Sequence, residues 1–406
     1  MSAIVFGDCD SRFSVVKDEF ERNFRERGEL GASVCVRVDG RCVVDLWGGV
    51  ADRRSGQAWD RDTLVLVWSC TKGAVALCAH MLVSRGLLEL DAPVAQYWPE
   101  FGREGKEAIT VRRLLDHQAG LPAIRRPLRP GDIYNWEYII ETLANETPFW
   151  APGTRQAYHA TTFGHLVGEV SRRITGKMPG EFFRNEVAGP LGLDFHIGLP
   201  EAEESRVART VRADPPPPGE VERCFDTEMR LNPQGIQALL VKNNGRHPHD
   251  QDSREAHAAD LPSHGGIANA RALAGLYAPL ALGGASDGVR LLDVDTIAAA
   301  AAVSSASADD GMLRFGLRFG LGFMKSSDNR HAAPDARDSL ILSEAAFGHA
   351  GMGGSIGFAD PEARLSFGYA MNKQGRSGLL NERGQSLVDA VYGSLGYRTN
   401  RHGRWQ

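Results

Sequence analysis

Long hydrophobic runs, an excess of positive charge and closely spaced cysteines are all missing from this chain of 406 residues. Because no apolar run approaches the length that crosses a bilayer, we expect no membrane partner. The formal net charge of −5 argues against a nucleic-acid partner, which requires a basic face. The N-terminus has neither a basic nor a long apolar region, so we expect no secretory signal and a cytoplasmic location.

The six cysteines show no C-x-x-C spacing, and in a reducing compartment we expect free thiols that pack as small apolar residues. A group of potential metal ligands, His247, His249, Asp250 and His257, falls in a polar stretch without a predicted strand or helix. Such a stretch is typical of a solvated loop. The sequence therefore implies neither a metal nor an organic cofactor.

What the chain does contain is a polar hexapeptide, residues 68–73, followed by an apolar run that continues to Val83. This pattern predicts a helix buried on all sides that ends at Gly86. Ser69 and Lys72 are three residues apart, so they share one face of a helical turn. A hydroxyl is a poor nucleophile until a neighbour takes its proton, and a desolvated lysine can do so. Because burial makes an ionised lysine costly, a functional role is expected for this pair.

Three other side chains compete with Ser69 as the nucleophile. Ser14 begins a second Ser-x-x-Lys, but its charged neighbours and apolar stripe predict a surface helix. Cys70 would point about 100° away from Ser69, off the face that holds Lys72. Ser355 lies in a G-x-S-x-G sequence, which α/β-hydrolases place on a strand-to-helix elbow, but a strand and a turn follow it here. We therefore favour Ser69.

Strand patterns occur near the N-terminus and again near the C-terminus. Asp39-Gly40 separates apolar runs over 34–38 and 42–47, which predicts a β-hairpin. Apolar residues at helical spacing over 163–174 and an Asn269 cap before 270–282 predict two of the helices between these ends.

Strands at both ends with helices between them predict an α+β fold, an antiparallel sheet flanked by helices. We predict a sheet lobe from residues 1–89 and 263–406 and an inserted helical lobe from 90–262. Within the latter, 201–262 is polar and broken, and a long irregular segment of this kind is usually either a lid or disordered; we favour a lid over the pocket.

Several short motifs occur in one order along the chain: Ser69-x-x-Lys72, the loop Gly120-Leu121-Pro122, Pro152-Gly153-Thr154 leading to Tyr158, and His349-Ala350-Gly351. In this set the chain resembles the serine β-lactamase and penicillin-binding-protein superfamily from about residue 20 to 395. Among its branches, the chain is most similar to class C-like β-lactamases and family VIII carboxylesterases.

The resemblance implies that Ser69 is the acylated nucleophile and Lys72 its proton acceptor. Tyr158 matches the tyrosine that moves protons to the leaving group and to water, and which of Lys72 and Tyr158 is the base in each step stays open. The backbone N–H groups of Ser69 and Met352 would form the oxyanion hole. By the same resemblance, substrate contacts are expected from His349, Gly351, Gln118 and His159.

Two departures from the lactamase pattern bear on the substrate. His349-Ala350-Gly351 stands where lactamases have Lys-Thr-Gly, and Tyr158-His159-Ala160 stands where they have Tyr-x-Asn. Losing a fixed cation and an amide weakens recognition of a carboxylated lactam, whereas a neutral ester loses little.

We therefore expect hydrolysis of short-chain carboxylic esters through a Ser69 acyl-enzyme. The expected partner is a small-molecule ester. Weak, promiscuous β-lactam hydrolysis is a further expected activity. The alternatives are amide hydrolysis, by a β-lactamase or a D-Ala-D-Ala-type peptidase, and a non-catalytic relative that binds acyl or peptidoglycan ligands. The oligomeric state is left open.

Overall fold

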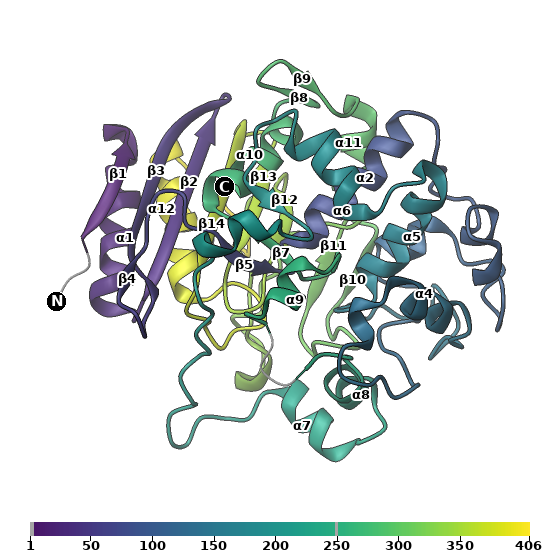
Figure 1. The fold of residues 1–406 in the computed structure, drawn as a ribbon. Coiled ribbons are helices and arrows are strands. Elements are labelled where there is room, and N and C mark those ends of the chain that lie inside the picture. Colours follow the sequence, from purple (N-terminus) through teal and green to yellow (C-terminus); the bar gives the residue numbers. More distant parts are fainter. Residues whose placement is uncertain (1–3, 248–250) are drawn as a thin grey trace.

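A seven-stranded antiparallel sheet formed by both ends of the chain is the main layer of the computed structural model, which describes residues 4–247 and 251–406 (Figure 1). Six strands follow the order β1 Val5–Cys9, β3 Arg41–Asp52, β2 Gly31–Val38, β14 Leu365–Met371, β13 Ile356–Asp360 and β12 Phe347–Ala350, and β4 Gln57–Ala58 pairs with β3. Because β2 pairs with β14 in the centre, the two ends of the chain complete one sheet. The predicted α+β class is confirmed.

The hairpin predicted at Asp39-Gly40 joins β2 to β3. Asp39 has φ +51° and Gly40 has φ +78°, the left-handed pair that a two-residue hairpin turn with matching strand twist requires. The second strand runs to Asp52, five residues beyond the predicted run, because its end also pairs with β4, Gln57–Ala58.

Helices cover both faces of the sheet. The α-helices of the described residues are α1 Ser14–Glu26, α2 Thr71–Ser84, α3 Val111–Leu115, α4 Trp136–Ala144, α5 Phe163–Thr175, α6 Pro179–Phe183, α7 Cys224–Leu231, α8 Ile236–Lys242, α9 Arg254–Ala258, α10 Ala270–Ala281, α11 Val294–Ala301 and α12 Glu382–Leu395. On β13, Phe358 stacks on Tyr392 of α12, whereas a Cβ on Gly357 would lie 2.6 Å from Tyr277 of α10. Because adjacent strand residues face opposite sides, α12 and α10 cover opposite faces.

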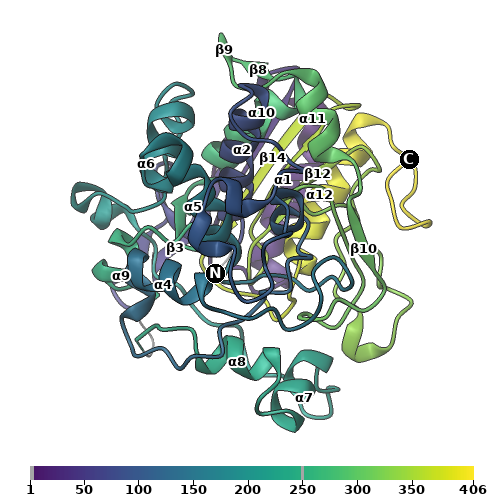
Figure 2. The same ribbon diagram turned by 90° about the vertical axis from the view of Figure 1, so that its right-hand side faces the viewer.

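Most of the remaining helices lie on the α10 side of the sheet, around α2 (Figures 1 and 2). The residues of α2 from Thr71 to Leu82 are all buried, and Gly86 follows with φ +69°, as the apolar run predicts. The helix predicted over 163–174 is α5, which ends at Gly176 in the left-handed conformation. Neither this nor any other helix of the described ranges is long and apolar enough to cross a bilayer.

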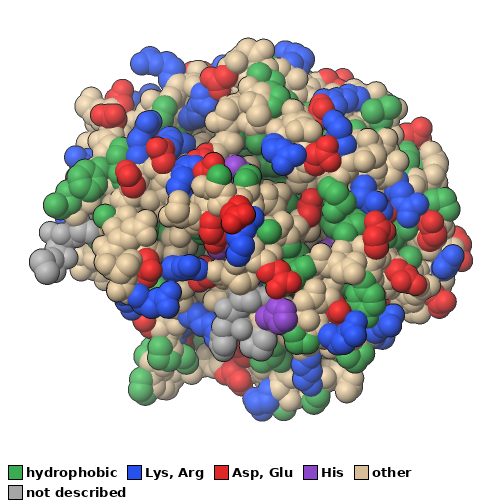
Figure 3. Space-filling model, in the orientation of Figure 1, with side chains coloured by type: hydrophobic (Ala, Val, Ile, Leu, Met, Phe, Trp, Pro, Cys, Tyr) green, Lys and Arg blue, Asp and Glu red, His purple; other side chains and the backbone are tan. Residues whose placement is uncertain are grey.

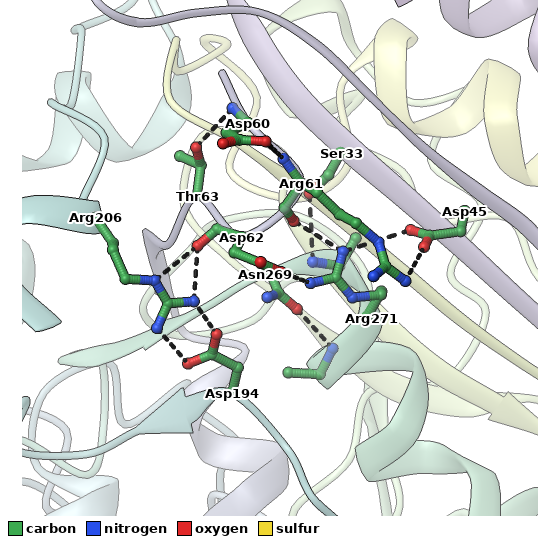
Figure 4. A network of polar contacts seen from close by, with 12 residues as sticks. Ser33, Asp45, Asp60, Arg61, Asp62, Thr63, Asp194, Arg206, Asn269 and Arg271 are labelled. Atoms are coloured by element: carbon green, nitrogen blue, oxygen red, sulfur yellow. Dashed lines mark hydrogen bonds and ion pairs between the residues drawn. The ribbon is translucent and has the colours of Figure 1, made fainter. Parts of the chain in front are cut away.

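A second, three-stranded sheet leads into α2. Its order is β5 Val65–Trp68, β7 Gly266–Ala268, β6 Phe195–His196. Two arginines hold the loop before β5: Arg206 donates to the Asp62 carbonyl at 2.8 Å and Arg271 to its carboxylate at 2.5 Å (Figure 4). Asp194 in turn pairs with Arg206. These bonds fix the strand whose end carries Ser69.

The remaining short strands are β8 Ala285–Ser286, β9 Val289–Arg290, β10 Ser305–Ser307 and β11 Leu317–Phe319.

The segment predicted to be irregular, 201–262, contains a 3₁₀ helix over Glu201–Arg206 and the helices α7, α8 and α9. Of these, α7 and α8 project at one end of the molecule (Figure 2). These helices are five to eight residues long, too short for the periodicity that reveals a helix in sequence. The division into two lobes stays a prediction.

The face drawn in Figure 3 mixes acidic and basic side chains across its surface.

Candidate active site

A tight turn between β5 and α2 presents Ser69. Trp68 adopts φ +50°, a left-handed conformation that is strained by about 1–2 kcal/mol for a residue with a side chain. The Thr71 hydroxyl stabilises this turn because it donates to the Trp68 carbonyl at 2.5 Å and accepts from the Gly266 N–H at 2.9 Å. The strained turn is thereby tied to both β5 and β7.

The Lys72 amine is fully buried next to Ser69. Its Nζ lies 3.1 Å from Ser69 Oγ and donates to the carbonyls of Ala160 and Ser263, both at 2.8 Å. Desolvation lowers the pKa of Lys72 well below its ordinary value. The amine is therefore neutral over a wider range of pH than an exposed lysine.

A neutral amine has two N–H groups and one lone pair. At Lys72 the carbonyls of Ala160 and Ser263 take the two N–H groups. The lone pair then faces the third neighbour, the Ser69 hydroxyl, which can donate its proton to it. This arrangement can activate a serine hydroxyl as a nucleophile.

Tyr158 faces the same space from the segment before α5. The centroid of its ring lies 4.9 Å from Lys72 Nζ. Burial raises the pKa of the Tyr158 phenol above its ordinary value, and the nearby Ser69 hydroxyl opposes part of that rise. No hydrogen bond of normal geometry joins the phenol oxygen to another side chain or carbonyl within 4–247 and 251–406, so it can bond to a ligand.

Two residues that the sequence did not single out hold Tyr158 in place. Its backbone N–H donates to the buried Asp310 carboxylate at 3.1 Å, which also accepts from the N–H of Met312 at 2.9 Å. Its ring packs against His117, with centroids 5.0 Å apart. Asp310 is 152 residues from Tyr158 along the chain, so no local pattern could have revealed this contact.

The edge strand β12 of the main sheet ends close to the turn that carries Ser69. A Cβ on Gly351, just after β12, would lie 2.3 Å from the Val67 carbonyl oxygen, so only glycine fits there. Among the described residues, the backbone N–H groups of Ser69 and Met352 donate to no acceptor. Two N–H groups on converging segments are therefore available to an oxyanion.

A cavity of about 760 Å³ opens in front of Ser69, Tyr158 and Met352. Its apolar wall consists mainly of Val221, Phe225, Leu240, Leu313, Phe315 and Met324. Its charged wall has six carboxylates and two guanidiniums: Asp214, Glu220, Glu222, Asp226, Asp335, Asp338, Arg223 and Arg376. Residues 213–226 and Leu240 belong to the segment predicted to be a lid.

Four residues that the resemblance assigned to substrate contact do not line this cavity. In His159, Nε2 accepts from the Leu121 N–H at 3.1 Å and Nδ1 pairs with the Ala157 carbonyl at 2.7 Å, so both ring nitrogens are occupied. The Gln118 amide instead donates to Asp116 at 3.3 Å. His349 is fully buried behind Tyr158, with ring centroids 5.9 Å apart, and Gly351 is buried against Val67. None of the four therefore lines the cavity in front of Ser69, and their contact with a substrate stays a prediction.

The alternatives to Ser69 lie elsewhere. Cys70 is buried, and its thiol donates to the His349 carbonyl at 3.3 Å. Ser355 is buried at the start of β13, with no helix after it. The group around His247 is incomplete because residues 248–250 lie outside the described residues; within the described ranges, no three His, Cys, Asp or Glu side chains form a metal site.

The family model described as beta-lactamase matches residues 18–391, so the chain belongs to this family. Among curated proteins, it is similar to "Esterase/beta-lactamase LipL" of Mycobacterium tuberculosis, with 35% identity over 372 residues that cover 91% of this chain and 83% of that protein.

Two solved structures share most of the fold. One, a family VIII carboxylesterase, has 36% identity and a TM-score of 0.84, and the match covers 96% of this chain and 100% of that one. The other, a penicillin-binding protein homolog from Caulobacter crescentus, has 37% identity and a TM-score of 0.84, with the same coverage. The resemblance inferred from the motifs is thus confirmed.

Proposed function

We propose that this protein is a serine carboxylesterase that cleaves short-chain esters through an acyl-enzyme on Ser69. The observation that supports this most is the environment of Lys72, whose two carbonyl partners leave the amine lone pair for the Ser69 hydroxyl. The names of the relatives, an esterase/beta-lactamase and a family VIII carboxylesterase, agree with ester hydrolysis.

In the acylation step, the Ser69 proton moves to Lys72 Nζ while Oγ attacks the ester carbonyl carbon. The carbonyl oxygen becomes an oxyanion that accepts from the N–H groups of Ser69 and Met352, each worth roughly 3 kcal/mol of transition-state stabilisation. The tetrahedral intermediate then expels the alcohol, which takes a proton through the Tyr158 phenol. In deacylation a water molecule attacks the acyl group, gives its proton to the Lys72–Tyr158 pair and releases Ser69 and a carboxylic acid.

The charge around the cavity favours a neutral ester over a carboxylated β-lactam. Burial lowers the pKa of His349 to about 3, so this imidazole is neutral where lactamases have a lysine. The cavity wall carries six carboxylates against two guanidiniums. Two of the carboxylates, Asp214 and Glu222, pair with Lys373 and Arg230 just outside this wall. The other four still outnumber the two guanidiniums, so a substrate carboxylate would meet net repulsion.

Two experiments test the proposal. Ser69→Ala should lower turnover of p-nitrophenyl butyrate by at least about a hundredfold, and a fluorophosphonate should label Ser69 in the parent protein by mass spectrometry. A variant that retains its turnover would exclude Ser69 as the nucleophile. A higher kcat/KM for a chromogenic cephalosporin than for the butyrate ester would instead favour the β-lactamase alternative.

The cytoplasmic location remains part of this proposal. All six cysteines are free thiols in the structure, as a reducing compartment would leave them. The proposed partner is a small neutral ester.

A further inference from the structure

The turn that presents the Met352 N–H is built largely of glycine. The Gly354 N–H donates to the Gly351 carbonyl at 3.0 Å, and the Gly351 N–H donates to the Ser355 carbonyl at 2.7 Å. Gly353 and Gly354 have φ +89° and +120°, values that residues with side chains rarely adopt. Glycine permits this conformation but does not enforce it, so the direction of the Met352 N–H depends on these two hydrogen bonds and on contacts that hold the turn from outside.

One carbonyl of the turn is held by two donors from a neighbouring segment. The Gly353 carbonyl accepts from the Gly375 N–H at 2.8 Å and from the Asn381 side-chain amide at 2.5 Å. Asn381 packs directly on the turn, since a Cβ on Gly354 would lie 2.1 Å from its Nδ2 atom. The glycine at 354 is therefore required for this approach.

The same side chain begins α12. Asn381 Oδ1 accepts from the Gly384 N–H at 3.1 Å, which satisfies one of the free N–H groups at the helix start. Its amide nitrogen is thereby directed at Gly353 with its orientation fixed from the opposite side. A helix that packs on the main sheet thus anchors the glycine turn.

We propose that Asn381 is a positioning residue for the oxyanion hole, acting through the Gly353 carbonyl to fix the direction of the Met352 N–H. This inference rests on the proposed function, because it assigns the Met352 N–H to the oxyanion. Asn381 does not line the catalytic cavity, so it acts on the transition state only through the turn. Its loss should reduce kcat and leave ground-state binding unchanged.

Two substitutions separate the bond to Gly353 from the helix cap. Asn381→Asp keeps an oxygen that can cap α12, and glycine is itself a favourable N-cap residue, but neither Asn381→Asp nor Asn381→Gly has a side-chain donor for the Gly353 carbonyl. The glycine variant also controls for the negative charge that aspartate adds. A matched control is Asn135→Asp, since Asn135 caps α4 by accepting from the Tyr138 N–H at 3.1 Å, away from the turn.

The measurements are kcat and KM for p-nitrophenyl butyrate, the melting temperature, and the affinity of an alkyl boronic acid that forms a tetrahedral adduct with a serine hydroxyl. We expect kcat to fall about 10- to 100-fold, part of the 10²–10³-fold loss seen when a whole donor is removed. The affinity for the boronic acid should fall by a similar factor, while KM and the melting temperature stay within error of the parent and of Asn135→Asp.

Full kcat in both Asn381 variants, together with an inactive Ser69→Ala, would refute the positioning role and leave the proposed function intact. A parallel fall in kcat and melting temperature would also refute it, because the residue would then act through stability alone. Activity that survives Ser69→Ala would instead overturn the proposed function itself.

Discussion

Replacing Lys72 by methionine removes the amine but keeps an unbranched side chain of similar length in the same buried position. A general base contributes about 10²- to 10⁴-fold to rate, which corresponds to roughly 2.7–5.4 kcal/mol at about 1.36 kcal/mol per factor of ten. We expect the acylation rate, followed as the burst of p-nitrophenol or as fluorophosphonate labelling, to fall within this range. A variant that keeps more than a tenth of the parent rate would show that Lys72 is not the base.

The same substitution reports the charge of Lys72 in the folded protein. Because the folded pKa lies below the unfolded value, the unfolded chain binds a proton that the folded chain does not over the pH range between the two. The stability contribution of Lys72 is therefore complete above the unfolded pKa of about 10.4 and decreases by about 1.36 kcal/mol per pH unit as pH falls towards the folded pKa. Methionine has no such dependence.

The free energy of unfolding of Lys72→Met, minus that of the parent, should consequently rise by about 1.36 kcal/mol for each unit that pH falls below 10, until pH reaches the folded pKa of Lys72. The absolute difference also includes the carbonyls of Ala160 and Ser263, which lose a donor at about 1–3 kcal/mol each, but this loss does not vary with pH. Urea unfolding of both proteins from pH 10 to 7 measures the slope. A difference that is constant with pH would show that Lys72 is protonated in the folded protein, and the lone-pair argument would fail.

Two further substitutions test other parts of the site. Tyr158→Phe removes the phenol oxygen but keeps the ring that stacks near Phe319, so kcat for p-nitrophenyl butyrate should fall by about a hundredfold with little change in melting temperature; unchanged kcat would exclude the phenol from proton transfer. Gly73→Ala places a Cβ 2.1 Å from the Tyr277 hydroxyl oxygen and should destabilise the fold by about 1–3 kcal/mol in calorimetry, with partial recovery when Tyr277→Phe is added. No recovery would place the strain elsewhere.

The features that depend only on residues close to one another in the sequence could be predicted from it. The spacing of Ser69 and Lys72 places both on one helical turn, and their atoms lie 3.1 Å apart. The hairpin at Asp39-Gly40 is likewise local, since the two left-handed residues that its turn needs are adjacent in the sequence.

The supporting contacts could not be predicted because they join distant segments. His159 looks polar and available in the sequence, but backbone groups of Leu121 and Ala157 occupy both of its ring nitrogens. Asp310 carries no motif at all, and its role as the acceptor for the Tyr158 N–H exists only once β10 and β11 are packed beside that residue. Resemblance to a family supplies residue positions, whereas hydrogen-bond partners decide which side of a residue faces the substrate.

The activation of Ser69 depends on the complete tertiary structure. Without fixed hydrogen-bond partners, the Lys72 amine could rotate and point its lone pair in any direction. Its two carbonyl partners belong to Ala160 and Ser263, which are 88 and 191 residues away along the chain. The Ser263 hydroxyl joins these two segments, because it donates to the Thr161 carbonyl at 2.6 Å and accepts from the Gly164 N–H at 2.6 Å. Since the carbonyls determine which direction is left for the lone pair, the proton acceptor is aimed at Ser69 only when all three segments have packed together.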